Sequence, residues 1–339
     1  MHQPKAKQLP SGMWRCRIRI KGQDISITRQ TEREAIAEAL AVKAGIMQVQ
    51  QAPGKKTLEQ VVDAYIDARR SVLSPSTICG YEAIKRTRFQ ASMHLQYSSL
   101  TPALLQKMVD QETRICGAKT VKNAWSLIAS AIEAETGNRP TVRLKQIVRK
   151  ERPFLDSDQI QIFLGLIHGK TIEVPALLAL SSLRRSEILD LKWDDIDMDA
   201  GIIHVRGAAV YDEHWTIIHK AENKNRASRR DVPLIKPLRD ALEQARRKSQ
   251  YVVTQNPSYL YKAINKVCRK NGLPEVGLHG LRHSFASLAY HLGISERVAM
   301  RIGGWSNTAT MHDIYTHLAS SDIAKSAAAL LQYFDGAQK

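Results

Sequence analysis

Between residues 58 and 137 the sequence repeats one signal: apolar residues at helical spacing, interrupted by short segments that favour the start of a helix. The interruptions read "LSPST", "LTPAL" and "CGAKT", and each contains a serine or threonine for the N-cap position. This pattern predicts a compact domain of four or five helices. Because 339 residues are enough for two or three domains, the helical region is expected to be one part of several.

Positive charge is graded along the chain, whose formal net charge is +17. Residues 1–56 hold 11 basic against 4 acidic side chains, residues 57–150 hold 14 against 8, and residues 151–339 hold 25 against 21. This gradient of charge indicates a protein in which several modules bind one extended polyanion. Nucleic acid is favoured over an anionic membrane surface, because no segment has the pattern of a basic amphipathic membrane helix.

The segment 12–28, "GMWRCRIRIKGQDISIT", alternates apolar with basic residues. This period of two predicts two short strands joined at "KG", with one apolar and one basic face. Thr31 and Glu34 follow at the spacing of a capping box before a helix. A solvated sheet edge is one interpretation of the basic face, and a ribbon in the major groove of DNA is the other. The residues expected to contact DNA there are Arg15, Arg17 and Arg19.

Two segments predict linkers: "QQAPGKKT" by its proline and glycine, and "GNRPTVRLKQIVRKERPF" by its two prolines and basic residues. The expected domains are therefore 1–55, 56–148 and 149–339, and the fold class is mainly α with small β-sheets. In the middle domain, Lys119 and Lys122 lie three apart at a helix start, which suits backbone phosphates and a solvated face equally well.

The third region begins with a helical pattern, continues with β segments around "GIIHVRG" and "DVPL", and returns to helix after residue 275. Its last apolar stripe, in "SSDIAKSAAALLQYF", predicts a C-terminal helix that packs on its own domain or on a neighbouring protomer. The four cysteines form no CxxC pair, and no signal peptide or bilayer-spanning run is present. We therefore expect a reduced cytoplasmic protein with no membrane association.

The stretch "HGLRHSFASLAYHL" at 279–292 places a polar cluster at the head of a helix whose expected core face consists of Leu281, Phe285, Leu288 and Leu292. His279 and Arg282 fall on one side near the helix N-terminus, where free N–H groups favour an anion. A satisfied polar patch is an equally simple interpretation. A metal is less favoured, because no glutamate follows the first histidine as a zinc-hydrolase helix requires.

Three further segments carry residues of the same chemistry. "SLRRSEIL" places Arg184 three residues before Glu187, and a half-buried arginine needs a carboxylate or a phosphate for its donors. "KAENKNRASRRDVPL" places Lys224 in a basic turn between β segments, and "GGWSNTATMHDIYTHL" contains Trp305 and Tyr315. Taken singly, these segments are also explained by helix-cap pairing, a solvated hairpin and core aromatic residues.

Together and in this order, the motifs resemble the tyrosine recombinase family of phage-integrase-like enzymes. The resemblance covers 152–339 by motif and 1–150 by layout. "SLRRSEIL" is similar to the first arginine box, "HGLRH" to the second box, and "GGWSNTATMHDIYTHL" to the box that holds the nucleophile. The roles that the resemblance implies are catalytic arginines at Arg184 and Arg282, a supporting acid at Glu187, the second-box histidine at His279, and the nucleophile at Tyr315.

The resemblance is looser at three positions. Lys224 matches the lysine of the family's β-hairpin, nine residues before Pro233, but Asn225 and Arg226 follow it in place of the usual pair, and Lys220 is a rival. The Thr-Gly that usually precedes the first arginine box is Ser181-Ser182 here. Trp305 stands where the family often has histidine, and an indole cannot transfer a proton.

The resemblance implies a site-specific DNA recombinase, or integrase, that acts through a 3′-phosphotyrosine intermediate without metal, ATP or another cofactor. It implies an arm-type DNA-binding module at 1–55, a core-binding domain at 56–148 and a catalytic domain at 149–339. The expected partners are double-stranded DNA, three further protomers in a tetramer on DNA, an excisionase and a DNA-bending protein, and the expected location is the nucleoid. The alternatives are a topoisomerase-like nicking-closing enzyme and a non-catalytic DNA-binding regulator of the same fold.

Overall fold

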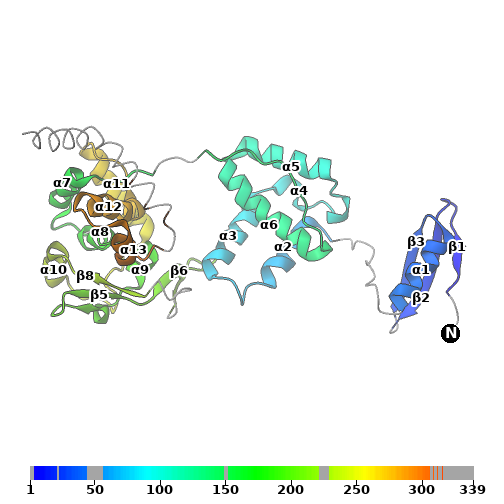
Figure 1. Ribbon diagram of the computed structural model, residues 1–339, viewed down its shortest axis with the longest axis horizontal. Helices are drawn as coiled ribbons and strands as arrows, with labels where there is room; N and C mark the ends of the chain where they lie inside the picture. The colour runs from blue at the N-terminus through cyan, green and yellow to red at the C-terminus, as the bar shows by residue number, and fades with distance from the viewer. Residues whose placement is uncertain are drawn as a thin grey trace, which may run out of the picture. The chain divides into compact units, whose positions relative to one another are not determined.

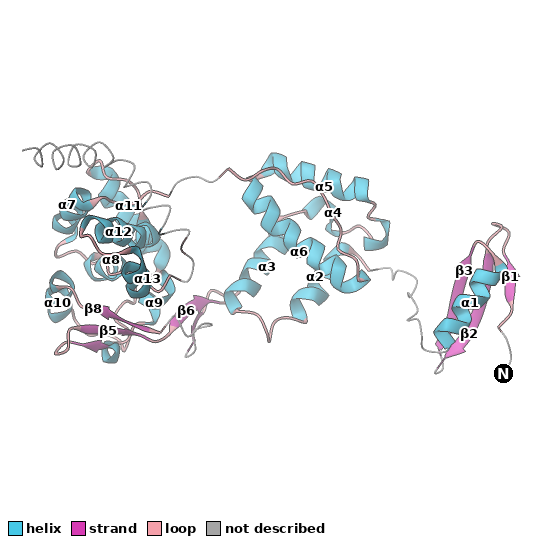
Figure 2. Ribbon diagram, viewed as in Figure 1, coloured by secondary structure: helices cyan, strands magenta, loops and turns pink. Residues whose placement is uncertain are grey.

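The structure, a computed structural model, describes residues 4–20, 23–43, 56–148, 152–220 and 229–305, together with positions 308, 311 and 315. Contacts divide the chain into two compact units, one of Met1–Leu73 with Gly80–Ile147 and the other of Ser74–Cys79 with Val148–Lys339. The described chain is mostly helical with small antiparallel sheets, which confirms the predicted fold class (Figures 1 and 2). In the described part, no helix is long and apolar enough to cross a membrane.

The N-terminal module is a three-stranded antiparallel sheet covered by one helix (Figure 1). Its elements are β1 (Ala6–Gln8), β2 (Trp14–Ile20), β3 (Gln23–Arg29) and α1 (Glu32–Lys43). The expected alternation is present, because Cys16 and Ile18 of β2 are buried against α1 while Arg17 is exposed. Strand β1 was not evident from the sequence. Thr31 accepts a hydrogen bond from the backbone N–H of Glu34, as expected for a cap.

The region 56–148 contains five α-helices and one 3₁₀ turn. They are α2 (Leu58–Asp67), α3 (Pro75–Thr87), α4 (Gln90–Met93), η1 (Tyr97–Ser99), α5 (Pro102–Ile115) and α6 (Ala118–Thr136). Thr57 and Thr101 cap α2 and α5 with their side chains. The expectation of a threonine cap in "CGAKT" is wrong, because Gly117 is the N-cap residue and Thr120 lies inside α6. Helix α6 provides the core through its apolar face, which packs on α2.

The described residues between 152 and 305 form seven α-helices and two small sheets. The helices are α7 (Ser157–Ile167), α8 (Glu173–Leu180), α9 (Arg185–Asp190), α10 (Lys236–Glu243), α11 (Pro257–Lys270), α12 (Gly277–His291) and α13 (Glu296–Gly303), with the 3₁₀ turn η2 (Trp193–Asp195). The strands are β4 (Ile196–Asp197), β5 (Ile202–Val205), β6 (Ala208–Tyr211), β7 (Ile217–Lys220) and β8 (Arg230–Pro233). Strands β4, β5 and β8 form one sheet, and the hairpin β6–β7, which the sequence analysis missed, forms another.

Helix α12 lies at the centre of this unit and packs against α8 and α11. Leu281 is fully buried in the core, as its helical spacing predicts. The expectation for Leu292 is wrong, because α12 ends at His291 and Leu292 is 62% exposed in the following turn. The predicted C-terminal helix in "SSDIAKSAAALLQYF" lies outside the described residues.

Candidate active site

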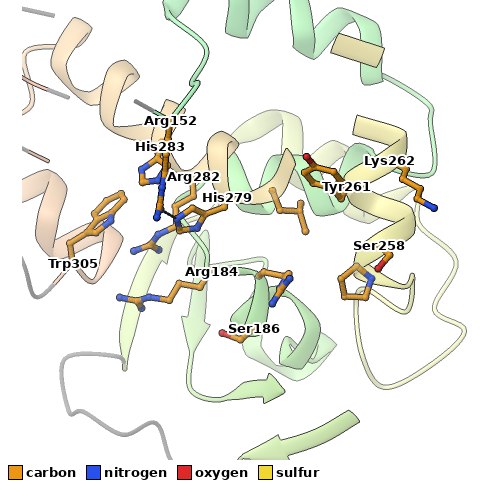
Figure 3. Close-up of a pocket in the computed structure, with 13 residues that line it drawn as sticks. Arg152, Arg184, Ser186, Ser258, Tyr261, Lys262, His279, Arg282, His283 and Trp305 are labelled. Carbon is orange, nitrogen blue, oxygen red and sulfur yellow. Dashed lines mark hydrogen bonds between the residues drawn. The ribbon is translucent and has the colours of Figure 1, made fainter. Parts of the chain in front are cut away.

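A strongly basic cavity of about 970 Å³ opens beside the N-terminal half of α12. Its walls come from the start of α9, the start of α11, the head of α12, the turn after α13 and the segment before α7. The lining residues are Arg152, Arg184, Arg185, Ser186, Pro257, Ser258, Tyr261, Lys262, Leu278, His279, Arg282, His283 and Trp305 (Figure 3). None of these thirteen is acidic, so the cavity suits an anionic ligand. The predicted residues Arg184, His279, Arg282 and Trp305 thus meet around one space.

Arg184 is placed by Glu187, the acid three residues later. Its backbone N–H donates to Glu187 Oε2 at 2.8 Å and its Nη1 donates to Glu187 Oε1 at 2.6 Å, while Nη2 donates to the carbonyl of Gly304. The Glu187 side chain is only 2% exposed, whereas the Arg184 side chain is 34% exposed toward the cavity. Glu187, the expected supporting acid, therefore contacts Arg184 through both of its carboxylate oxygens.

The turn before Arg184 adopts a strained geometry. Ser182, which stands where the family often has glycine, has a φ of +76° and is fully buried. Its carbonyl accepts hydrogen bonds from Arg282 and, at 3.3 Å, from Arg230, and its hydroxyl donates to the carbonyl of Ile302 at 3.3 Å. The replacement of glycine by serine therefore retains a left-handed turn and adds one hydrogen bond.

Arg282 is nearly enclosed, with 2% of its surface exposed. Burial, followed by the charge of Arg184, lowers the pKa of Arg282 to about 9, so the guanidinium stays charged at neutral pH. Its central carbon lies 4.1 Å from the ring centroid of Trp305, a cation–π contact. The ring of Trp305 stacks in turn on Phe285, at 6.0 Å between centroids.

The glycines of "GGW" make room for this stack. A Cβ atom on Gly303 would lie 1.7 Å from the ring of Trp305, and Gly304 has a φ of +62°. A side chain at either position would displace the indole or strain the turn. The two glycines therefore hold Trp305 against Arg282.

His279 and Arg152 meet at 2.8 Å between the histidine Nε2 and the arginine Nη1. Because a guanidinium only donates, Nε2 is the acceptor and the imidazole is neutral with its proton on Nδ1. Burial, then the charges of Arg152 and Arg282, lower the pKa of His279. His279 is therefore neutral at neutral pH, and its one acceptor nitrogen, Nε2, is engaged by Arg152 in this structure.

His283, which follows Arg282, is buried deeper than His279. Its ring lies edge-on to that of His279 at 4.5 Å, and neither ring nitrogen has a hydrogen-bond partner in the described structure. Burial, then His279, lower the pKa of His283 to about 4. Within the described residues, no group of three histidine, cysteine or acidic side chains is arranged to hold a metal ion.

Tyr315 is not among the residues that line the cavity. Its hydroxyl donates to the carbonyl of Ile294 at 2.9 Å, and its ring packs edge-on to Tyr290 at 5.3 Å between centroids. Burial, then Glu296, raise the pKa of the phenol. The structure therefore brings the arginines, the histidine and the indole together, and it places the tyrosine hydroxyl at the turn between α12 and α13.

Several predicted residues are only partly described or lie elsewhere. Lys224 lies outside the described residues, and for Lys220, at the end of β7, only the backbone is described. Arg15, Arg17 and Arg19 lie in β2, with no description of the Arg19 side chain. Lys119 and Lys122 are exposed in the first turn of α6.

Sequence reasoning missed Arg152, His283 and above all Arg230. Arg230 begins β8, and its side chain is 6% exposed and forms an ion pair with Glu187. Its signal was the period of two in "RDVP", because Arg230 lies on the same face of the strand as the buried Val232. Composition alone does not distinguish this inward-pointing arginine from the other basic residues of the same run.

The helical domain, the mixed α/β unit and the arginine-rich cavity are the features of the tyrosine recombinase class. The family model described as "Phage integrase family" matches residues 153–322, half of the chain, and the chain belongs to this family. Residues 1–152 lie outside the matched range.

Curated relatives and solved structures agree with this assignment. The tyrosine recombinase XerA of Thermococcus kodakarensis is 33% identical over 156 residues, which cover 44% of this chain and 51% of the relative. The chain spans about half the length of the curated relatives it matches. The Tn1549 transposon integrase in complex with transposon right end DNA is 17% identical, with a TM-score of 0.64 over 80% of this chain and 99% of the other. A lambda integrase tetramer bound to a Holliday junction is 16% identical, with a TM-score of 0.54 over 90% of this chain and 96% of the other. These two likenesses show the fold.

Proposed function

We propose that the chain is a site-specific DNA recombinase of the integrase type, which cuts and rejoins DNA through a 3′-phosphotyrosine. The observation that carries the proposal is the convergence of Arg184, Arg282, His279 and Trp305 on one basic cavity. The family membership and the integrase structures of the same fold support it.

In the proposed reaction, the scissile phosphate occupies the cavity between Arg184 and Arg282. Their guanidinium groups donate to its non-bridging oxygens and stabilise the negative charge of the pentacoordinate transition state. The phenol oxygen of Tyr315 attacks phosphorus while its proton passes to Nε2 of the neutral His279, which must first release its hydrogen bond from Arg152. The bond from phosphorus to the 5′ oxygen breaks, and Lys224 supplies a proton to that leaving oxygen.

Rejoining reverses these steps with a 5′ hydroxyl from another strand. The phosphotyrosine bond conserves the energy of the cleaved phosphodiester, so the proposed cycle uses no ATP and no cofactor. Trp305 packs on Arg282 and offers its indole N–H, while Glu187 holds Arg184.

The remaining modules are proposed to hold the DNA. The module at 1–55 would contact arm-type sites through the basic face of β2, and the domain at 56–148 would contact the core site with Lys119 and Lys122. Four protomers would assemble on two duplexes, with an excisionase and a DNA-bending protein as accessory partners on nucleoid DNA. The tetramer is proposed by analogy with lambda integrase.

A suicide substrate tests the proposal. Duplexes from the sequence that flanks the gene in its native element are nicked near the expected crossover, so that cleavage releases a short fragment and traps the covalent complex. The expected product is a 3′-linked adduct on Tyr315, identified by mass spectrometry of the tryptic peptide. Tyr315→Phe should form none, and the matched control Tyr290→Phe should form the adduct.

The outcomes separate the alternatives. Exchange of strands between two duplexes supports the recombinase, whereas adduct formation with relaxation of supercoils and no exchange would identify a nicking-closing enzyme. DNA binding without any adduct would identify a non-catalytic regulator.

A further inference from the structure

The guanidinium of Arg230 donates to four backbone or side-chain acceptors on three residues, Ser182, Glu187 and Ile302. Nη1 and Nη2 donate to the two carboxylate oxygens of Glu187, at 3.0 and 2.9 Å, and Nε donates to the carbonyl of Ile302 at 2.8 Å. Nη2 also reaches the carbonyl of Ser182 at 3.3 Å. A guanidinium has five donors, so one remains after these bonds. With a side chain that is 6% exposed, Arg230 is committed to the protein and is not placed to bind phosphate.

Each segment that Arg230 holds carries a residue of the cavity. Glu187 orients Arg184, and the Ser182 carbonyl also accepts from Arg282. Ile302 precedes the turn that ends in Trp305, and Gly304 in that turn packs directly on Arg230, since a Cβ there would lie 3.0 Å from the arginine Cδ. Arg230 thus lies behind the cavity, at the junction of the groups expected to grip the phosphate.

We infer that Arg230 is a positioning residue for strand cleavage, fixing Glu187 and the turn before Trp305 so that Arg184 and Arg282 keep their geometry around the phosphate. The inference rests on the proposed function. It assigns Arg230 no contact with DNA, and it separates this arginine from its exposed neighbour Arg229.

A pH profile distinguishes positioning from simple support of the fold. Burial raises the pKa of Glu187, but the hydrogen bonds and charges of Arg230, and then of Arg184, outweigh burial and lower it. The charged groups that face Glu187 in the described structure are Arg230 from β8, Arg184 at the head of α9 and Arg282 from α12. Without Arg230, the pKa of Glu187 rises, so its carboxylate is lost at a higher pH than in the wild type.

The experiment compares the full-length wild type with Arg230→Gln, Arg230→Lys and the control Arg229→Gln. Three quantities are measured: the melting temperature, the Kd for core-site DNA, and the single-turnover rate of adduct formation between pH 5 and 8. For Arg230→Gln the expected rate is about a hundredfold lower, because small misplacements of catalytic groups cost about that factor. The Kd should stay within about threefold, and a new loss of rate should appear on the acid side.

Arg230→Lys restores a charge beside Glu187 and should therefore return the acid side of the profile toward that of the wild type. Its rate should stay about tenfold low, because an ammonium cannot hold four acceptors in a fixed plane. Arg229→Gln should match the wild type in rate and profile. The double variant Glu187→Gln/Arg230→Gln removes both buried charges and so avoids an unpaired carboxylate if the single variant fails to fold. It should cleave slowly and lack the new acid-side loss.

Two results would overturn the inference: wild-type rates in folded Arg230→Gln or in the double variant, or a loss of rate that is equal at every pH and matched by the loss of DNA binding. A wild-type chain that forms no adduct would instead contradict the proposed function, and the inference would fall with it.

Discussion

The hydroxyl of Tyr315 and the carbonyl oxygen of Ile294 lie 2.9 Å apart, and this hydrogen bond holds the phenol at the turn between α12 and α13 instead of in the basic cavity. The ring is also held by Tyr290, which it meets edge-on at 84° between planes. For Tyr315 to attack a phosphate, its hydroxyl has to leave the carbonyl of Ile294. In the proposed cycle, this docked position of the tyrosine would precede cleavage.

Loosening the docked position should speed cleavage. An edge-to-face aromatic pair contributes about 1 kcal/mol, so Tyr290→Leu should shift the population of docked Tyr315 about fivefold toward release. The expected result is a severalfold faster single-turnover adduct rate on a suicide substrate, with Tyr290→Phe unchanged because it keeps the ring. A slower rate in folded Tyr290→Leu would mean that the docked position belongs to the active geometry.

Removing one arginine of the phosphate clamp should affect cleavage far more than binding. Oxyanion-type donors are worth about 3 kcal/mol, so Arg184→Ala should lower the adduct rate about a hundredfold or more. DNA affinity should change little, because many other phosphate contacts remain. Arg297, exposed on α13 and outside the cavity, provides the matched control Arg297→Ala. Equal losses of rate and affinity in Arg184→Ala would contradict a role in the transition state.

Helical spacing predicted part of the cavity, because it determines which side chains share a face, and the resemblance to the family supplied the other motifs. His279 and Arg282, three apart at the start of α12, meet the cavity for that reason. The role of Arg230 could not be predicted from the sequence. Arg230 lies in a run of basic residues, and composition does not show which arginine of such a run points into the protein. The position of Tyr315 depends on a hydrogen bond to the backbone carbonyl of Ile294. Because every residue has a backbone carbonyl, the sequence does not show which one accepts this bond.

The size of the side chain at position 303 should determine whether the indole of Trp305 can pack on Arg282. In Gly303→Ala the added methyl would overlap the ring of Trp305, which would have to leave Arg282. We expect the adduct rate to fall at least tenfold while DNA binding is retained, because the ring no longer packs on Arg282, which is proposed to bind the scissile phosphate. Gly165→Ala in α7 is the control, since a Cβ there meets no atom within 4 Å. Equal rates for the two variants would show that the stack is dispensable.

The pH dependence of cleavage should report on Arg152. A general base acts only when neutral, so the rate is lost as pH falls through the pKa of His279. Arg152 is the second cause, after burial, that lowers this pKa, while Arg184, Arg185 and Arg282 also face the ring. Arg152→Ala should therefore raise the pKa of His279 and move the loss of rate to a higher pH.

The measurement is the single-turnover adduct rate from pH 5 to 8 for the wild type, Arg152→Ala and His279→Gln. The last variant has no titrating imidazole at this position and should be slow, without the wild-type acid-side loss. If the pH profile of Arg152→Ala coincides with that of the wild type, the charge of Arg152 does not lower the pKa of His279.

Ser182 and Ser181 should respond differently to replacement by glycine. Ser182 has a φ of +76°, so glycine relieves about 1 kcal/mol of backbone strain but loses a hydroxyl bond to Ile302 worth about 1 kcal/mol. Ser181, with a φ of −80°, has no such strain to relieve, and glycine costs about 0.5–1 kcal/mol through backbone entropy, offset in part by removal of a buried hydroxyl that has no hydrogen-bond partner in the described structure. Melting temperatures should therefore be near that of the wild type for Ser182→Gly and lower for Ser181→Gly. The opposite order would mean that the hydroxyl bond to Ile302 outweighs the strain, and that serine is preferred at this turn.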